Sequence, residues 1–326
     1  MKLFLGLLPS ARPDQTRIFT EAGGKLIDLQ LAYAALLWQN GRQANAYELA
    51  SFYFPATIAA FIERDKQASD ALKEVVGFAR NASLSNLRGP TDEQIVYDAQ
   101  TIRLLPPLLN PERSFVIGFS DRARTEAMPQ PDIPTGFYKL PQTFVTHSAP
   151  VIWPKFSNDV DADSSIAIVI GKAGKRIAPE NAWDHVAGAT LMIDITARDV
   201  NRREGLTTNN LLGKNFPSST CLGPAVLIGN SRKDFEALEV ELSLDGTVQQ
   251  KFALRDCVFT VEQIISRWSI VGLKPGDWLA IGASMARRGE SLQQPVPLKI
   301  GSTLRCASPA IGELSHQVVG SGGLRR

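Results

Sequence analysis

The sequence predicts a mainly β protein with a small amino-terminal α+β module, and three observations support this. Residues 104–320 contain many short apolar runs separated by Pro, Gly and Asn, and few helical patterns. Residues 1–103 combine short strand patterns with amphipathic helices. Asp245-Gly246, between two alternating runs, is a strong signal for a two-residue hairpin. So many strands with so few helices favour a folded-over sheet or barrel over a parallel α/β sheet.

The amino-terminal module begins with two strand patterns, at 2–8 and 17–29. Helical spacing of apolar residues follows at 46–54 and 56–79, with Lys and Glu on the opposite face. We expect the aromatic residues of these helices to form core rather than a ligand site.

The larger part contains eight strand patterns and two helical ones. The strand patterns span 114–120, 149–154, 166–171, 189–195, 225–230, 236–252, 277–283 and 302–308, and the helical patterns span 179–187 and 260–272. The tail, 321–326, is rich in Gly and is expected to be flexible.

Composition excludes several classes of protein. A chain of 326 residues suggests about two domains, and a formal net charge of +2 gives no reason to expect nucleic acid or an anionic membrane as partner. The three cysteines are far apart in sequence, which excludes a zinc knuckle and suits a reducing compartment, so we expect a cytoplasmic protein. No apolar run approaches the ~20 residues of a membrane span.

Two aspartates in strand patterns are the first candidates for chemistry. Asp163 begins an apolar run, and Asp194 lies within another, where a buried carboxylate must be paired, protonated or bound to metal. Two such carboxylates meeting in one sheet would suit Mg²⁺. A structural ion pair between Asp194 and Arg198 or another base is an equally weighted alternative.

Other polar residues are less informative by themselves. Lys214 follows a glycine in a polar loop, where it could neutralise an anionic substrate or simply be solvated. The histidines, His147, His185 and His316, share no metal-ligand spacing. The chain has no phosphate-binding loop, dinucleotide-binding fingerprint or nucleophile elbow.

The order of several segments resembles the fumarylacetoacetate hydrolase superfamily. The most telling are "ITARD" and "LKPGDWLAIGA", and others are "FYKLPQTFVTHSAPVIWP", "DADSSIAIVIG" and "GKNFPSSTCLGP". The resemblance covers about 104–319, and the amino-terminal module resembles the small extra domain of many members.

This resemblance implies a fold of rolled β-sheets, a homodimer and a keto-acid substrate. Members cleave, decarboxylate, hydrate or isomerise β-diketo and 2-keto acids. A divalent cation chelates the 2-oxo-carboxylate and promotes an enolate, and a His-Glu pair moves a proton or activates water. The usual cation ligands are two acids of an E-x-E motif on one strand, which point the same way, and a third acid before "SARD".

Set beside that pattern, this chain keeps only part of the metal site. Asp163 matches the first acid and Asp194 the third, but the neutral Ser165 stands at the second. Since a serine hydroxyl is a poor ligand for a hard dication, we expect weakly bound Mg²⁺ or no cofactor.

The catalytic positions are altered as well. Lys214 matches the family's substrate-binding lysine, whereas Arg124 replaces the catalytic histidine and cannot act as a base. Ala127 replaces the glutamate, and the adjacent Glu126 could stand in for it. We predict Lys214, Arg124 and Glu126 as catalytic residues. The residues predicted to bind substrate are Tyr138, Lys139, His147, Ser165, Gly282 and Ala283.

Three functions follow. The first is an atypical enzyme acting on a β-keto or 2-keto acid by decarboxylation, tautomerisation, cyclisation or C–C cleavage, in which Arg124 and Lys214 supply fixed positive charge. The second is a degenerate protein that binds a ligand or partner without turnover. The third is a conventional Mg²⁺-dependent hydrolase with Asp163 and Asp194 as ligands.

Overall fold

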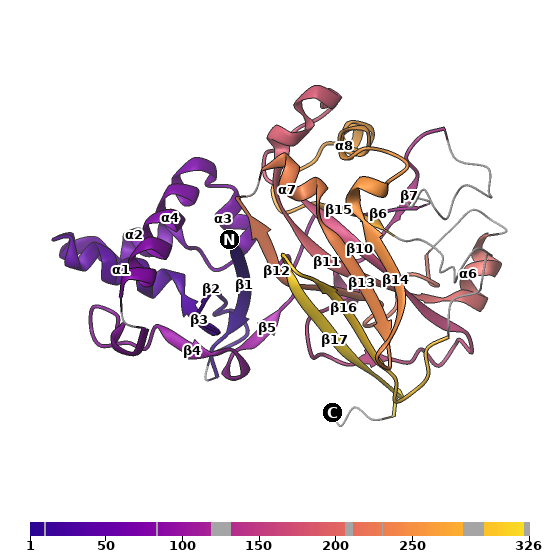
Figure 1. The fold of residues 1–326 in the computed structure, drawn as a ribbon, viewed down its shortest axis with the longest axis horizontal. Coiled ribbons are helices and arrows are strands. Elements are labelled where there is room, and N and C mark those ends of the chain that lie inside the picture. Colours follow the sequence, from indigo (N-terminus) through magenta and orange to yellow (C-terminus); the bar gives the residue numbers. More distant parts are fainter. Residues whose placement is uncertain are drawn as a thin grey trace.

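The β-rich part of the molecule consists of two facing sheets, and the amino-terminal module projects from one side of it (Figure 1). The computed structural model describes residues 1–9, 11–82, 84–118, 132–205, 211–229, 231–282 and 297–322. Its mainly β architecture with α+β character confirms the predicted fold class. In the described ranges no helix is both long and apolar enough for a membrane crossing.

The larger sheet has twelve strands and runs through both parts of the chain. Its order is β4-β3-β2-β1-β12-β11-β10-β15-β6-β7, with β5 paired to β1 and β8 paired to β12. The strands are β1 (Lys2–Leu7), β2 (Arg17–Ala22), β3 (Lys25–Asp28), β4 (Val96–Asp98), β5 (Arg103–Leu105), β6 (Ser114–Ile117), β7 (Gly136–Tyr138), β8 (Phe144–Val145), β10 (Val160–Ile170), β11 (Val186–Ala197), β12 (Thr220–Ile228) and β15 (Trp278–Gly282).

The smaller sheet has five strands in the order β14-β13-β16-β17-β9 and covers one face of β10 and β11. Its strands are β9 (Val151–Ile152), β13 (Glu239–Leu244), β14 (Thr247–Ala253), β16 (Thr303–Ser308) and β17 (Gly312–Val319). Asp245 and Gly246 join β13 to β14 with φ of 49° and 80°, as a type I′ turn requires, which confirms the predicted hairpin.

The apolar core between the sheets comes from alternate strand residues. Ile166 and Ile168 of β10 pack in one cluster with Leu242 of β13 and Leu304 of β16. The residues between them on β10, such as Ala167, point to the opposite face of the large sheet. Each polar residue of β10 therefore faces the smaller sheet if it alternates in step with Ile166 and Ile168, and the opposite side if it alternates in step with Ala167.

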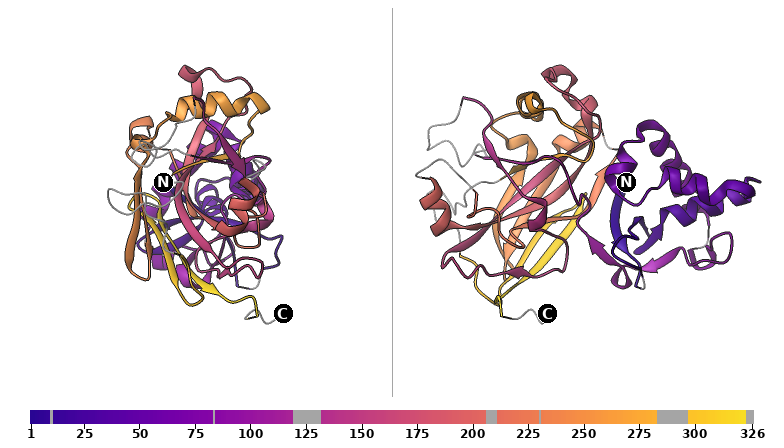
Figure 2. Two further views of the ribbon diagram at one scale, coloured as in Figure 1. Left: turned by 90° about the vertical axis from the view of Figure 1, so that its right-hand side faces the viewer. Right: turned by 180° about the vertical axis from the view of Figure 1, so that it is seen from behind.

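The amino-terminal module packs its helices on that opposite face. They are α1 (Leu29–Gln39), α2 (Ala46–Tyr53), α3 (Ile58–Ile62) and α4 (Asp65–Asn81). Leu72 of α4 and Leu3 of β1 share a core cluster with Ala167 and Met192 of the central strands. Because β1 also pairs with β12, the module is joined to the β-rich part by both a strand ladder and a shared core. Figure 2 shows the module beside the β-rich part from two further directions.

Helix α1 was missed by the sequence patterns. Its sequence, LQLAYAALLWQ, is apolar on nearly all sides, so no amphipathic period marks it. Asp28 begins the helix by accepting a hydrogen bond from the Leu31 N–H at 3.0 Å.

Few helices occur in the β-rich part. Within the described residues of this part they are α6 (Arg198–Gly205), α7 (Arg232–Glu236) and α8 (Val261–Trp268). The predicted helix at 179–187 is instead a 3-10 helix, Pro179–His185. The other 3-10 segments are Gln43–Asn45, Leu84–Asn86, Ala99–Thr101, Pro141–Thr143, Leu254–Asp256 and Ser269–Val271.

Candidate active site

The candidate site lies where β10 and β11 carry polar residues on the module-facing side of the sheet. Asp163 is directly opposite Asp194 in the antiparallel ladder, and Asp161 is opposite Thr196. Residues directly opposite share a face, and so do alternate residues on one strand, so these side chains and Ser165 project together. All of them are buried.

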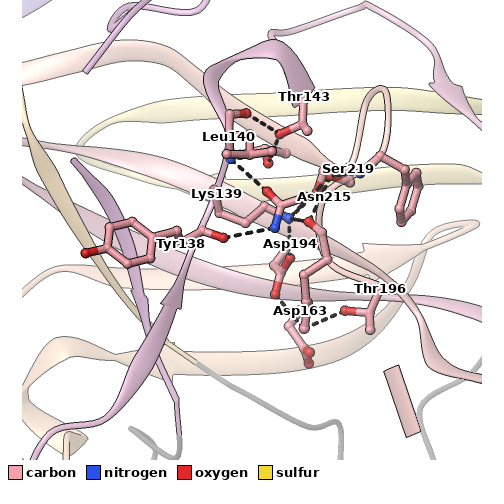
Figure 3. Close-up of polar contacts among 12 residues, drawn as sticks. Tyr138, Lys139, Leu140, Thr143, Asp163, Asp194, Thr196, Asn215 and Ser219 are labelled. Carbon is pink, nitrogen blue, oxygen red and sulfur yellow. Dashed lines mark hydrogen bonds and ion pairs between the residues drawn. The ribbon is translucent and has the colours of Figure 1, made fainter. Parts of the chain in front are cut away.

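Asp194 is held between two lysines, and we call Lys139, Asp194 and Lys214 the lysine cluster. Figure 3 shows Lys139 and Asp194 together at its centre. Lys139 Nζ donates to Asp194 Oδ1 at 2.8 Å, and Lys214 Nζ donates to Asp194 Oδ2 at 2.6 Å. Burial opposes ionisation of this carboxyl, but the two ammonium groups outweigh burial and hold the pKa of Asp194 below its usual value. Asp194 is therefore a paired carboxylate.

The two lysines differ in how many of their ammonium hydrogens have a hydrogen-bond acceptor. Lys139 Nζ also donates to the backbone oxygens of Lys214 and Ser219, and its side chain is fully buried. Lys214 Nζ donates to Asp194 and, at 2.6 Å, to Thr196 Oγ1. An ammonium carries three hydrogens, so within the described residues Lys214 keeps one without a hydrogen-bond acceptor. The Phe137 ring centroid lies 5.0 Å from this ammonium.

A second cluster, Asp161, Asp163 and Arg198, lies beside the first, and we call it the arginine cluster. Arg198 Nε donates to Asp161 Oδ1 and Oδ2 at 2.7 and 2.6 Å, and its Nη2 donates to Asp163 Oδ2 at 2.7 Å. Burial raises the pKa of Asp161 to about 7; Arg198 opposes this shift and the charge of Asp163 adds to it. Thus Arg198 pairs with these two acids, and the structural ion pair predicted for Asp194 with Arg198 or another base is formed with Lys139 and Lys214.

Gln250 of β14 reaches across from the smaller sheet to fix Asp163. Its Nε2 donates to Asp163 Oδ1 at 3.0 Å and to the Ala162 carbonyl at 3.2 Å, while its Oε1 accepts from the Ser164 N–H at 3.0 Å. The described pairing of β10 with β15 stops at Ser165. The Gln250 amide thus takes the place of a peptide group where that ladder ends.

Protein hydrogen-bond donors surround the carboxylates in this arrangement. Each of the four carboxylate oxygens of Asp163 and Asp194 already accepts a hydrogen bond from Gln250, Arg198, Lys139 or Lys214. Ser165, at the remaining ligand position, is neutral. Across the described ranges, no group of three His, Cys, Asp or Glu side chains is arranged to hold a metal ion.

The structure brings several predicted site residues together and separates others. Lys139 and Lys214 both contact Asp194, and Asp163 lies opposite Asp194 in the strand ladder. Ser165 pairs with Gly282 in the neighbouring strand. Tyr138 is about half exposed, and its ring points away from the lysine cluster (Figure 3). His147 instead lines a cavity beside the amino-terminal module. Arg124, Glu126 and Ala283 lie outside the described residues.

Three residues of the site were not predicted as such: Asp161, Arg198 and Gln250. Asp161 could have been predicted, because it lies two residues before Asp163 on the same strand and alternate residues face the same side. Gln250 carried no such signal, because only the packing of the second sheet brings it to Asp163, 87 residues away in sequence.

Comparison with known proteins points to one family. Residues 116–319 match the family model described as fumarylacetoacetate (FAA) hydrolase, C-terminal. The chain is 31% identical to the mitochondrial oxaloacetate tautomerase fahd2 of Xenopus laevis over 91% of this chain and 83% of that protein. It is 30% identical to the oxaloacetate tautomerase YisK of Bacillus subtilis over 70% and 78% of the two chains.

Solved structures share the fold over nearly the whole chain. Maleylpyruvate hydrolase from Sphingobium, in complex with manganese(II) and pyruvate, has a TM-score of 0.70 at 19% identity and covers 98% of this chain and 99% of its own. A 5-carboxymethyl-2-hydroxymuconate delta-isomerase from Mycobacterium smegmatis has a TM-score of 0.67 at 20% identity, covering 99% and 100%. The family predicted from the sequence motifs is confirmed: this chain belongs to the fumarylacetoacetate hydrolase family.

Proposed function

We propose that this chain is an enzyme that tautomerises a 2-oxo acid, with oxaloacetate as the first substrate to test. The observation that carries the proposal is the Lys214 ammonium, which has a spare hydrogen next to a row of oriented carboxylates. Two relatives of about 30% identity are named oxaloacetate tautomerases, which favours proton transfer over C–C cleavage among the reactions open to this family.

Lys214 is the electrophile in this proposal. Its position is fixed by Asp194 and Thr196, so its remaining N–H can point to the keto oxygen of a bound substrate. As a proton leaves the neighbouring carbon, negative charge develops on that oxygen. A preoriented ammonium in a buried site stabilises such an enolate strongly.

Asp163 is the proposed proton acceptor. It lies directly opposite Asp194 on the same face of the sheet, and Gln250 and Arg198 fix the direction of its two oxygens. The substrate C–H bond breaks, its proton moves to the Asp163 carboxylate, and its electrons form the enolate C=C bond. Returning the proton to the enolate oxygen gives the enol and restores Asp163, so the reaction needs no co-reactant.

Lys139 has a positioning role in this scheme. It was predicted to bind substrate, but its hydrogens are directed to Asp194 and to backbone oxygens inside the protein. It orients Asp194, which in turn orients Lys214. Arg124 and Glu126 remain predicted groups for gripping a substrate carboxylate and for proton transfer, respectively.

We further propose that the reaction depends weakly, or not at all, on a divalent cation. The support is that protein donors already occupy the oxygens of Asp163 and Asp194, and that Ser165 supplies no third carboxylate. The homodimer implied by the family resemblance and the cytoplasmic location expected from the sparse cysteines are also proposals. Size-exclusion chromatography with light scattering would test the dimer.

The test follows the keto–enol conversion of oxaloacetate by ultraviolet absorbance, with the full chain, before and after EDTA treatment. The expected result is catalysed conversion that EDTA leaves unchanged and that Lys214→Met slows by about 10²–10³-fold. Conversion lost with EDTA and restored by Mg²⁺ or Mn²⁺ would establish a conventional metal mechanism. If no oxo acid in a panel is turned over but several raise the melting temperature, the chain is a binding protein.

A further inference from the structure

A cavity separate from the candidate active site lies between the amino-terminal module and the β-rich part. Its volume is about 760 Å³, within the usual range for small-molecule sites. Apolar side chains form most of its wall, including Phe4, Leu26, Ile102, Val145, Pro224 and Ile311. None of the residues in the lysine or arginine cluster lines it.

Two buried polar atoms at this cavity lack a partner in the described structure. They are Thr146 Oγ1 and His147 Nδ1. Thr146 is only 4% exposed, and the turn from Thr146 to Ala149 is fixed by the Ala149 N–H donating to the Thr146 carbonyl at 3.0 Å. Burying a hydroxyl without a partner is unfavourable, so these two atoms favour a ligand that supplies a polar group.

The charges around the cavity favour an anion. Lys2 pairs with Glu21 at 2.6 Å, and Glu313 pairs with Arg305 at 2.7 Å. Arg103 of β5 lines the cavity and has no ion pair with any described residue. A planar guanidinium with open donors is well suited to a carboxylate.

The spacing between these groups limits the ligand. Thr146 Oγ1 and Pro107 both approach Gly223 closely, at 2.9 and 3.2 Å from the point where a Cβ would lie. Arg103 is four residues before Pro107, so their backbones are at most roughly 13 Å apart. Arg103 and Thr146 both line this cavity, so a ligand that reaches both has a polar group at each end and an apolar middle.

We propose that this cavity binds an elongated amphipathic carboxylic acid. Its carboxylate pairs with Arg103, its apolar middle packs against Phe4 and Leu26, and a second polar group bonds to Thr146 and His147. This site takes a different class of ligand from the active site, and it does not depend on the proposed tautomerase activity.

The test measures binding of 8-hydroxyoctanoate and octanoate to the full chain by isothermal titration calorimetry. We expect 8-hydroxyoctanoate to bind about 5-fold more tightly, since its hydroxyl replaces the missing hydrogen-bond partner. Thr146→Val, which keeps the shape but removes the hydroxyl, should bring the two acids to equal affinity. Arg103→Gln should weaken both about 10-fold. Circular dichroism of each variant checks that it is folded.

Lys214→Met serves as the control for location, because it alters the active site alone. Binding should be unchanged in that variant and should persist in saturating oxalate. Loss of binding in either case would place these acids in the active site and overturn the proposal. The proposal is also overturned if neither acid binds to the unaltered chain, which includes the outcome in which a second copy of the chain covers the cavity. Equal affinities of the two acids for the unaltered chain would overturn it as well.

Discussion

The lysine cluster and the arginine cluster lie side by side on one pair of strands, yet the first has more positive than negative groups and the second has more negative than positive groups. In the first, two ammonium groups share the single carboxylate of Asp194. In the second, two carboxylates, Asp161 and Asp163, share the single guanidinium of Arg198. The first cluster can therefore stabilise a developing anion, and the second presents carboxylates that can accept a proton. Proton transfer to and from carbon requires both.

The clusters also differ in how they are anchored. Asp194 is bonded by side chains that come from two loops distant in sequence, at positions 139 and 214. Asp161 and Asp163 are bonded by Arg198, which begins the helix directly after β11, and by Gln250 from the other sheet. Changes at either cluster should therefore affect stability and turnover in different proportions.

The largest effect is expected from Lys139→Met. This change leaves Asp194 buried with half of its charge compensation gone, and breaking a buried ion pair costs about 3–5 kcal/mol. Chemical denaturation should show this loss in the free energy of unfolding. A second change, Asp194→Leu, should recover part of the loss, because it removes the stranded charge. If the double variant is less stable by the sum of both single losses, the two residues are not coupled.

Lys214→Met should lower turnover strongly and, because it also breaks a buried ion pair of Asp194, should reduce the free energy of unfolding as well. Removing a preoriented donor to an oxyanion typically lowers kcat by about 10²–10³-fold. The matched control is Lys175→Met, at an exposed lysine outside both clusters, which should leave kcat unchanged. A similar loss of turnover in both variants would show that general electrostatics, and not this ammonium, supports catalysis.

The pH dependence of stability should distinguish the clusters. The pKa of Asp161 is raised by burial to about 7, so between its unfolded value of 3.8 and pH 7 the folded state binds more protons. The contribution of Asp161 to the free energy of unfolding therefore falls as the pH rises, by about 2 kcal/mol from pH 5 to pH 7. Asp194 has a lowered pKa in the folded state, so it stabilises the folded protein at pH values above its unfolded pKa. This stabilisation is lost only as the pH falls through the lower folded-state pKa.

Denaturation at pH 5, 6 and 7 would check this difference. The variant Asp161→Asn should lose the slope in that range. An unchanged slope would mean that Asp161 stays ionised throughout, held by Arg198.

The smallest effect is expected from Arg198→Lys. An ammonium keeps the charge but cannot bind Asp161 with two hydrogen bonds while also reaching Asp163. We expect kcat to fall about 10-fold, with KM less affected, because Asp163 loses its orientation. Arg203→Lys, at an exposed arginine of the same helix, is the control. A change confined to KM would assign Arg198 to substrate binding.

Much of the site could be predicted because strand parity is a local property. The alternation of polar and apolar residues in β10 and β11 already indicates that Asp163 and Ser165 share a face and that Asp194 is buried. The hairpin at Asp245-Gly246 is equally local, since the two residues themselves favour positive φ. Helix α1 escaped prediction because a helix apolar on every side has no period to detect.

By itself, then, the sequence determined the family, the mainly β fold and the face on which the acids lie. It also determined that one carboxylate of the family's metal site is missing, at Ser165. Only the tertiary structure decided which cation each acid receives, because the partners of Asp194 and Asp163 come from loops and from a second sheet 20 to 87 residues away. The physical reason is that ion pairing depends on distance in space, which a local sequence pattern does not encode.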